Sequence, residues 1–254
     1  MHPDSTVLSE KSLIDKSRQS CVRIECPNIG RSGTGFWISD RCIITCFHVL
    51  GDPNSFQIRN IEVITSSGEK LDAECVSFPS QADPAPIQYD FAVIKVKSAP
   101  TNHCQALNFI SPNSRIEIGS EILFSGFPLD SPDKVSMVTH KGMISGLAKD
   151  GSLVSLEAPI NKGNSGGAVI STSGEVLGIV DQREGGISQG LDQVRQQIAA
   201  AKNSGAVYVM GVNANETIGS LIETLDKYIS TGMGYAVNIK FAQSYLSRHS
   251  DILK

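Results

Sequence analysis

The 254-residue chain has no strong excess of either charge, few aromatic residues and a single tryptophan. Its formal net charge is −4, so it lacks the basic surface by which proteins bind nucleic acids or anionic membranes. No apolar run approaches the ~18 residues that a membrane-spanning helix needs. The first twenty residues are polar and lack the charged-then-apolar pattern of a secretory signal. We therefore expect a cytoplasmic protein without nucleic-acid or membrane partners.

The cysteine content also bears on the compartment. An even number of cysteines suits disulfide bonds in a secreted protein, but nothing in this sequence directs secretion. Cytosolic thiols normally stay reduced, and several of these cysteines lie in apolar runs where a free thiol packs as a small hydrophobe. The sequence favours free thiols over disulfide bonds. The six are Cys21, Cys26, Cys42, Cys46, Cys75 and Cys104.

Short apolar runs rich in β-branched residues dominate residues 21–180, separated by Gly, Pro, Asn and Asp. Such runs predict strands of a β-barrel or sandwich. The polar, proline-punctuated segment 101–115 is expected to cross between two lobes. The clearest strand-like runs are 21–26, 35–39, 42–45, 91–96, 121–124, 153–156 and 176–180.

Residues 182–232 break this pattern. Apolar residues recur at helical spacing from Leu191 to Ala201 and from Ile218 to Ile229, with Asn215 as a candidate N-cap. A strand-like run, 207–210, lies between them. A further strand is expected over 234–239, followed by a helix that continues to Leu253. A weaker amphipathic pattern in residues 1–20 uses Leu8, Leu13 and Ile14.

Three motifs carry the chemistry: Thr-Cys-Phe-His-Val at 45–49, Tyr-Asp-Phe-Ala-Val at 89–93, and Gly-Asn-Ser-Gly-Gly-Ala at 163–168. Each alone has a structural explanation: a packed histidine, a strand-capping aspartate and a tight turn. Together, His48, Asp90 and Ser165 supply a base, a carboxylate that orients it and a nucleophile. Their order along the chain is that of the chymotrypsin triad.

The glycines around Ser165 suit acyl transfer. They allow backbone angles closed to other residues and keep side chains away from an approaching substrate. The backbone N–H groups of Gly163 and Ser165 can then converge on the oxyanion that forms during the reaction. The predicted oxyanion hole is the segment Gly163, Asn164 and Ser165.

With Ser32–Ile38, Gly126–Pro128 and Gly174–Gly178, these motifs closely resemble the trypsin-like peptidases of the HtrA/Deg branch. The resemblance covers most of residues 20–180, and 234–246 resembles that family's closing strand and helix. It implies an all-β fold of two six-stranded barrels with the triad in the cleft between them. Residues 1–20 would be an N-terminal extension, 21–110 the first barrel lobe, and 111–254 the second lobe with a helical insertion at 182–232.

The sequence departs from the family at several points. Asn164 stands where digestive zymogens carry an aspartate that pairs with a newly cut N-terminus. We expect no PDZ domain, and the aromatic residues that hold HtrA trimers together are not evident in the first thirty-five residues. The insertion falls where the family has a loop beside the substrate pocket. We expect it either to pack over the second barrel or to act as a mobile lid and partner surface.

The same resemblance places Pro159 at the floor of the substrate pocket. A cationic substrate side chain would need a buried carboxylate there, because an unpaired buried charge is costly. We therefore expect a small or medium apolar residue before the scissile bond. Ile160 and Val180 would also line this pocket, and Asp181 would stand at its entrance.

No metal or cofactor is expected, because His2, His103 and His140 have no ligand-like spacing to cysteine or carboxylate. For Cys46, simple packing is favoured over a redox-sensitive thiol. The predicted activity is that of a serine endopeptidase acting on proteins or peptides, regulated by a partner protein or by the insertion. A silent protease-like binding scaffold and an esterase with the same triad are the alternatives.

Overall fold

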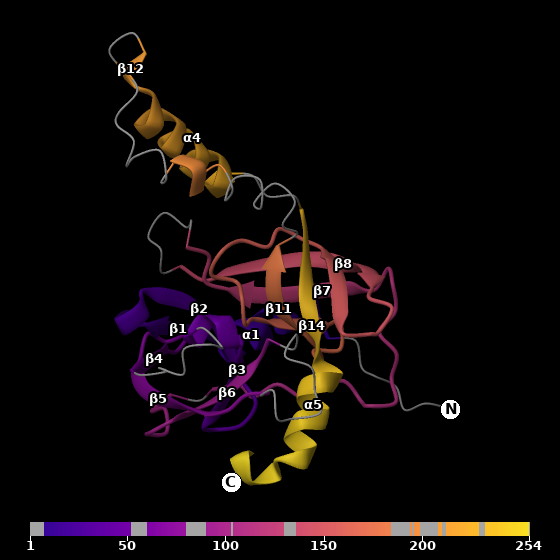
Figure 1. Cartoon of the computed structure of the whole chain (residues 1–254). Helices are drawn as coiled ribbons and strands as arrows, with labels where there is room; N and C mark the ends of the chain where they lie inside the picture. The colour runs from indigo at the N-terminus through magenta and orange to yellow at the C-terminus, as the bar shows by residue number, and fades with distance from the viewer. Residues whose placement is uncertain are drawn as a thin grey trace. The chain divides into compact units, whose positions relative to one another are not determined.

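The computed structural model describes residues 8–51, 60–79, 90–102, 104–129, 136–183, 194, 196–198, 208–209, 212–228 and 232–253. Two closed antiparallel barrels of six strands each dominate it, as Figure 1 shows in indigo to purple and in pink to yellow. The expectation of two six-stranded β-barrels is therefore confirmed. Within the described residues, no helix is both long and apolar enough to cross a membrane.

The first barrel has the strand order β1-β2-β3-β6-β5-β4. Its core includes the fully buried side chains of Ile24, Phe36 and Ile94, one from each of β1, β2 and β6. The strands are β1 (Cys21–Cys26), β2 (Arg31–Trp37), β3 (Cys42–Thr45), β4 (Ile61–Ile64), β5 (Lys70–Ser77) and β6 (Ala92–Val96).

The second barrel has the order β10-β11-β14-β9-β8-β7. Its closing strand comes from beyond the insertion, where Gly234 pairs with Leu156 and Ala236 with Val154. The strands are β7 (Glu121–Gly126), β8 (Val138–Leu147), β9 (Leu153–Glu157), β10 (Ala168–Ser171), β11 (Val176–Arg183) and β14 (Met233–Asn238).

Four of these strands, β4, β5, β8 and β10, are absent from the clearest apolar runs of the sequence. Strand β5 alternates charged, exposed residues with buried ones, and most of β8 is exposed or half-buried. The local apolar content of β5 and β8 is therefore low, whereas β4 and β10 are apolar but only four residues long. Strands β5 and β8 form because they complete barrels whose other strands are more apolar.

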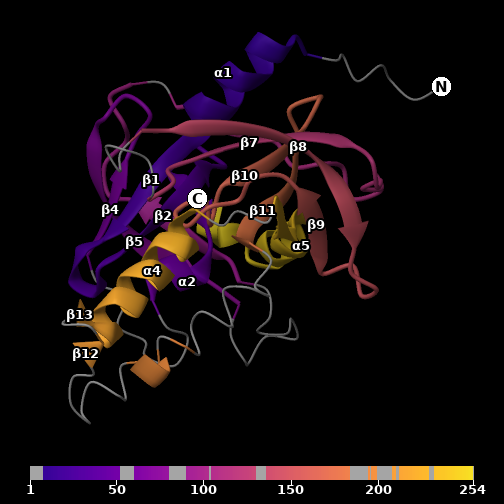
Figure 2. The same cartoon turned by 90° about the horizontal axis from the view of Figure 1, so that it is seen from above.

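The helices outside the insertion tie the barrels together. Helix α1 (Glu10–Ser20) starts at Ser9, whose hydroxyl accepts a hydrogen bond from the N–H of Ser12. It lies beside β7 in Figure 2, and Ser17 Oγ is 2.8 Å from Ser125 Oγ. A short helix α2 (Phe47–Leu50) and two 3-10 turns, η1 (Pro27–Ile29) and η2 (Ser250–Leu253), complete these elements.

Helix α5 (Ile239–Arg248) connects the second barrel to the first. Asn238 caps it by accepting from the N–H of Lys240 at 3.1 Å. Near its end, Tyr245 packs edge-on against Phe91, with ring centroids 5.6 Å apart. The Tyr245 hydroxyl also donates to the carbonyl oxygen of Phe78 at 2.9 Å. These contacts hold the chain next to Asp90.

Residues 183–231 form a compact unit of their own. It contains β12 (Tyr208–Val209), β13 (Val212–Asn213) and α4 (Ala214–Tyr228). The predicted N-cap Asn215 is wrong by two residues: the Asn213 side chain accepts from the N–H groups of Asn215 and Glu216, so the helix starts earlier. Of the predicted earlier helix, residues 194 and 196–198 are helical, and Leu191 and Ala201 lie outside the described residues.

All six cysteines are free thiols in the structure. Four of them, Cys21, Cys26, Cys42 and Cys46, are buried within the apolar core. Burial raises the pKa of Cys26 to about 11 and that of Cys75 to about 12. These thiols therefore remain protonated at neutral pH and pack as apolar groups.

Candidate active site

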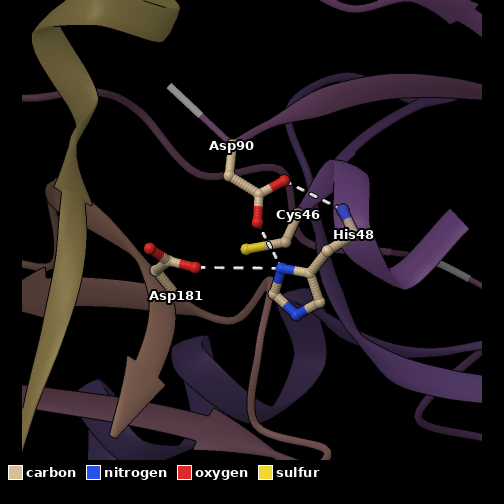
Figure 3. Close-up of side chains that lie close together, drawn as sticks. All are labelled: Cys46, His48, Asp90 and Asp181. Carbon is tan, nitrogen blue, oxygen red and sulfur yellow. Dashed lines mark hydrogen bonds and ion pairs between the residues drawn. The ribbon is translucent and has the colours of Figure 1, made fainter. Parts of the chain in front are cut away.

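His48 lies in helix α2, directly after strand β3. Asp90 approaches it from the chain that enters β6, the strand next to β3 in the sheet. One carboxylate oxygen of Asp90 accepts from the backbone N–H of His48 at 2.9 Å, and the other is hydrogen-bonded to ring Nδ1. Both carboxylate oxygens of Asp90 thus bind His48, one at its backbone and one at its ring. The ring is fixed with Nδ1 bonded and, as Figure 3 shows, its other nitrogen facing away from the carboxylate.

Arg31 supports the turn that carries His48. Its guanidinium donates to the carbonyl oxygen of His48 and to that of Gly51, the latter at 2.7 Å. These bonds satisfy two carbonyl oxygens of a helix too short to satisfy them itself. The sequence offered no motif that would single out this arginine.

Ser165 lies in the loop before β10, and Thr34 of the first barrel holds that loop. The Thr34 hydroxyl donates to the carbonyl of Gly163 at 2.6 Å, and the Thr34 N–H donates to the carbonyl of Ser165 at 2.8 Å. The N–H of Gly166 donates to the carbonyl of Val180 at 2.7 Å. These bonds place the loop that carries Ser165 where the two barrels meet.

Two glycines are required by this loop. Gly163 and Gly166 have φ angles of +98° and +92°, which other residues rarely adopt. A Cβ atom on Gly166 would lie 2.0 Å from the carbonyl oxygen of Thr34, and one on Gly163 would lie 2.2 Å from that of Phe127. Gly166 therefore permits the close contact between the two barrels, and Gly163 permits a close contact within the second barrel.

The loop leaves two backbone donors unused. Among the described residues, the N–H groups of Gly163 and Ser165 form no hydrogen bond. The N–H of Asn164, in contrast, donates to the carbonyl of Asn161 at 3.0 Å. Of the three residues predicted for an oxyanion hole, Gly163 and Ser165 thus have N–H groups available to a ligand.

The hydroxyl of Ser165 donates to the backbone carbonyl of Asp181 at 2.7 Å. It forms no hydrogen bond to His48 in this structure. Transfer of the serine proton to the imidazole therefore first requires the hydroxyl to leave the Asp181 carbonyl. Hydrogen bonds of catalytic groups often form only when substrate is bound.

Asp181 has a second role that its expected place at a pocket entrance did not reveal. Its carboxyl oxygen lies 3.8 Å from Nδ1 of His48, the same ring nitrogen that Asp90 contacts in Figure 3. Cys46 completes the group, with its thiol donating to the carbonyl of Val180 at 3.1 Å. The aspartate directly after the apolar run 176–180 was the available sequence signal.

The electrostatics of this group depend on burial and on two acidic side chains. Burial raises the pKa of Asp181 to about 6, together with the charge of Asp90 and a hydrogen bond to it. Burial also acts to raise the pKa of Asp90, but its hydrogen bonds and charge interaction with His48 outweigh this and lower it. Burial raises the pKa of the Cys46 thiol well above its usual range, and both carboxylates add to that effect.

His48 responds to the same surroundings. Burial acts to lower its pKa, but the hydrogen bond to Asp90 and the charges of Asp90 and Asp181 outweigh burial. The Arg31 cation opposes them more weakly, and the net shift raises the pKa of His48. Cys46, His48, Asp90 and Asp181 each offer one donor atom within 4.8 Å of the others. His48 is hydrogen-bonded to Asp90 and the Cys46 thiol to the Val180 carbonyl, so we interpret these residues as a proton-transfer group.

The residues expected to line a substrate pocket lie on two segments of the second barrel. Pro159 is exposed and follows β9, whereas Ile160 and Val180 are buried. Asp181 points its carboxyl group at His48. His140 is in β8 with its ring 5.1 Å from that of Phe124, whereas His2 and His103 lie outside the described residues.

The two closed six-stranded antiparallel barrels define a chymotrypsin-like fold, and His48, Asp90 and the Ser165 loop lie where the barrels meet. The model of the trypsin-like peptidase domain matches residues 33–179. The chain belongs to this family of trypsin-like peptidases.

Curated relatives and a solved structure agree with this assignment. The chain is 31% identical over 150 residues to a probable periplasmic serine endoprotease DegP-like of Brucella suis, covering 58% of this chain and 26% of that protein. It is 30% identical over 196 residues to the putative protease Do-like 14 of Arabidopsis thaliana, covering 71% and 43%. It therefore spans less than half the length of either relative.

The crystal structure of the serine endoprotease from Yersinia pestis superposes with a TM-score of 0.61 at 21% identity. The superposition covers 95% of this chain and 66% of that one. At this identity the likeness supports the fold. The homology to HtrA- and DegP-like serine proteases rests on the sequence matches.

Proposed function

We propose that the protein is a serine endopeptidase that hydrolyses peptide bonds through an acyl-enzyme. The observation that carries the proposal is the engagement of both Asp90 oxygens by His48. This arrangement keeps the proton on Nδ1 and leaves the other ring nitrogen to accept one. A histidine that merely packs in a core has no need of an acidic partner on both its backbone and its ring.

In this mechanism the Ser165 hydroxyl turns from the Asp181 carbonyl to His48 when substrate is bound. His48 accepts its proton as Ser165 Oγ attacks the scissile carbonyl carbon. The developing oxyanion is bound by the N–H groups of Gly163 and Ser165, which have no other partner among the described residues. His48 then protonates the leaving amine, and water hydrolyses the acyl-enzyme by the same steps.

The substrate class follows from the family. The relatives are named as proteases and endoproteases, so we assign proteins or peptides as substrates. A small or medium apolar residue before the scissile bond remains our prediction, with Pro159, Ile160, Val180 and Asp181 around it. Cleavage-site profiling against a peptide library would test it, and a preference for Lys or Arg would contradict it.

We further propose that a partner protein or the 183–231 unit controls the activity. The support is the hydrogen bond from Ser165 to the Asp181 carbonyl, which competes with the bond that the reaction needs. An activator would have to favour the alternative bond to His48. Full peptidase activity of the purified chain without any partner, equally fast after deletion of the unit, would contradict this control.

A fluorophosphonate probe tests the activity itself. The probe reacts with a serine only when a base activates it, so wild-type protein should be labelled and Ser165→Ala should not. Ser173→Ala, at a hairpin hydroxyl bonded to Glu175, is the matched control and should be labelled like wild type. A wild-type chain that stays unlabelled, even with protein substrates present, would indicate a binding scaffold. Ester turnover without amide turnover would indicate an esterase.

A further inference from the structure

Two acidic side chains, not one, face Nδ1 of His48. Asp90 is bonded to it, and the Asp181 carboxyl oxygen lies 3.8 Å away. The Asp181 side chain is only 14% exposed, so water screens its charge weakly. A triad needs a single carboxylate here, and Asp181 therefore calls for its own explanation.

The position of Asp181 is held firmly from both barrels. Its own carbonyl accepts from Ser165, and the carbonyl of the preceding Val180 accepts from Cys46 and from the N–H of Gly166. One oxygen of its carboxyl group lies within 4.8 Å of one of Asp90. Two carboxylates this close repel one another when both are ionised, which favours a pair that holds one proton.

We infer that Asp181 is a positioning residue that shares one proton with Asp90 and thereby sets the charge facing Nδ1 of His48. This inference builds on the proposed function, in which His48 is the base. With the proton present, the two carboxyl groups carry one negative charge, as a single triad aspartate would. Without it, they carry two charges and hold the imidazole in its protonated form.

The other ionisable groups nearby do not replace this effect. The Cys46 thiol stays neutral because it is buried beside both carboxylates. The Arg31 cation is committed to the carbonyl oxygens of His48 and Gly51 and acts against protonation of the ring. Asp90 and Asp181 are therefore the groups that decide the charge on the Nδ1 side of the ring.

Ionisation of Asp181 therefore has two opposing effects on His48 as a base. An ionised Asp181 makes His48 a stronger base and stabilises the imidazolium that forms in the reaction. Because it raises the pKa of His48, it also reduces the fraction of His48 that is neutral at a given pH. Asp181→Asn keeps the size of the side chain and a hydrogen-bond donor toward Asp90 but removes the second charge. The variant therefore distinguishes the effect of the charge from that of the side-chain shape.

The decisive measurement is an NMR titration of the His48 ring nitrogens, which needs no activity. We expect Asp181→Asn to lower the pKa of His48 by about one unit, the smaller end of what a charge at this distance produces. Asp72→Asn removes a carboxylate from an exposed position on β5 and should leave the pKa of His48 unchanged. An unchanged His48 titration in Asp181→Asn, or an equal shift in Asp72→Asn, would overturn the inference.

A wild-type measurement covers the case in which Asp181→Asn does not fold. Carbon-13 labelling of aspartate carboxyl groups should show one that titrates near pH 6, because burial raises the pKa of Asp181 to about 6. Aspartate resonances that all titrate below about pH 5, within the ordinary range, would contradict the shared proton.

Fluorophosphonate labelling against pH then links the charge to reactivity. The acidic limb of the profile should move down by about one pH unit in Asp181→Asn, with the plateau rate reduced by less than about tenfold. A labelled Asp181→Asn with the wild-type limb would overturn the inference and leave the peptidase proposal intact. A wild-type chain that is never labelled would refute the peptidase proposal, and the NMR titration would still decide the role of Asp181.

Discussion

The hydroxyl of Thr34 in the first barrel donates to the carbonyl of Gly163 in the second at 2.6 Å, and accepts from the N–H of Phe127 at 3.1 Å. This fully buried side chain on β2 therefore fixes the loop that carries Ser165 relative to the first barrel, which carries His48. It is separated from Gly163 by 129 positions in the sequence.

Thr34→Val tests this link. The variant keeps the volume but leaves the Gly163 carbonyl and the Phe127 N–H without a partner, so we expect a loss of about 1–3 kcal/mol in unfolding free energy. Fluorophosphonate labelling of Ser165 should also slow, because the loop is no longer held. Urea unfolding and labelling kinetics measure the two effects. Thr34→Ser retains the hydroxyl and should restore both, and labelling at the wild-type rate in Thr34→Val would refute the positioning role.

Gly166→Ala tests the close approach of the barrels. A Cβ atom would meet the Thr34 carbonyl at 2.0 Å at a φ of +92°, so we expect a loss of more than about 2 kcal/mol and no labelling. Gly119→Ala is a matched control, because Gly119 has a φ of +89° with nothing within 4 Å of the added atom. It carries the backbone strain without the clash. Equal losses in both variants, measured by urea unfolding, would rule out the contact as the cause.

Asp90→Asn tests the tautomer of His48. An amide in this place can bind the ring with the wrong nitrogen protonated, which in the chymotrypsin triad costs on the order of 10⁴ in rate. We expect a comparable loss in labelling and peptide cleavage while circular dichroism stays unchanged. A loss smaller than about tenfold would show that Asp90 does not orient the base.

The pH dependence of activity follows from the shift at His48. The pKa of His48 is raised above its ordinary value, so the ring stays protonated to higher pH and cannot accept the Ser165 proton there. We expect the rate of labelling to rise with pH through a midpoint above about 6.5. A midpoint below that value, determined from labelling rates across buffers of constant ionic strength, would contradict the arrangement of carboxylates around the ring.

The pH dependence of stability follows from Asp181 with the opposite sign to an ordinary ion-paired carboxylate. Its pKa is raised to about 6, so between the unfolded value of about 4 and pH 6 the folded chain binds more protons than the unfolded chain. Stability therefore falls as pH rises through this window. Asp181→Asn should be more stable than wild type at pH 7.5, by at most about 3 kcal/mol, and nearly equal to it at pH 4. Urea unfolding at the two pH values provides the comparison, and a constant difference between the proteins would contradict the shift.

The sequence by itself determined much of the fold, because the strongly apolar strands carry their own signal. Residues 21–26 and 42–45 coincide with β1 and β3. The three motifs predicted His48, Asp90 and Ser165 as a triad, and the structure shows the hydrogen bonds between His48 and Asp90. Strands β5 and β8 were not evident, because most of their residues are exposed or half-buried and acquire extended structure by pairing with apolar neighbours. The cytoplasmic location stays a prediction.

Only the tertiary structure decided how these residues act on one another. The sequence placed Asp181 at the entrance of a pocket, whereas the paired barrels bring its carboxyl group to His48 and its carbonyl to Ser165. Contacts of this kind join segments that are far apart in the chain, and they depend on the register and packing of both barrels. A local pattern can predict a base and a nucleophile, but the carboxyl groups around His48 and the hydrogen bond of Ser165 are set where the two barrels meet.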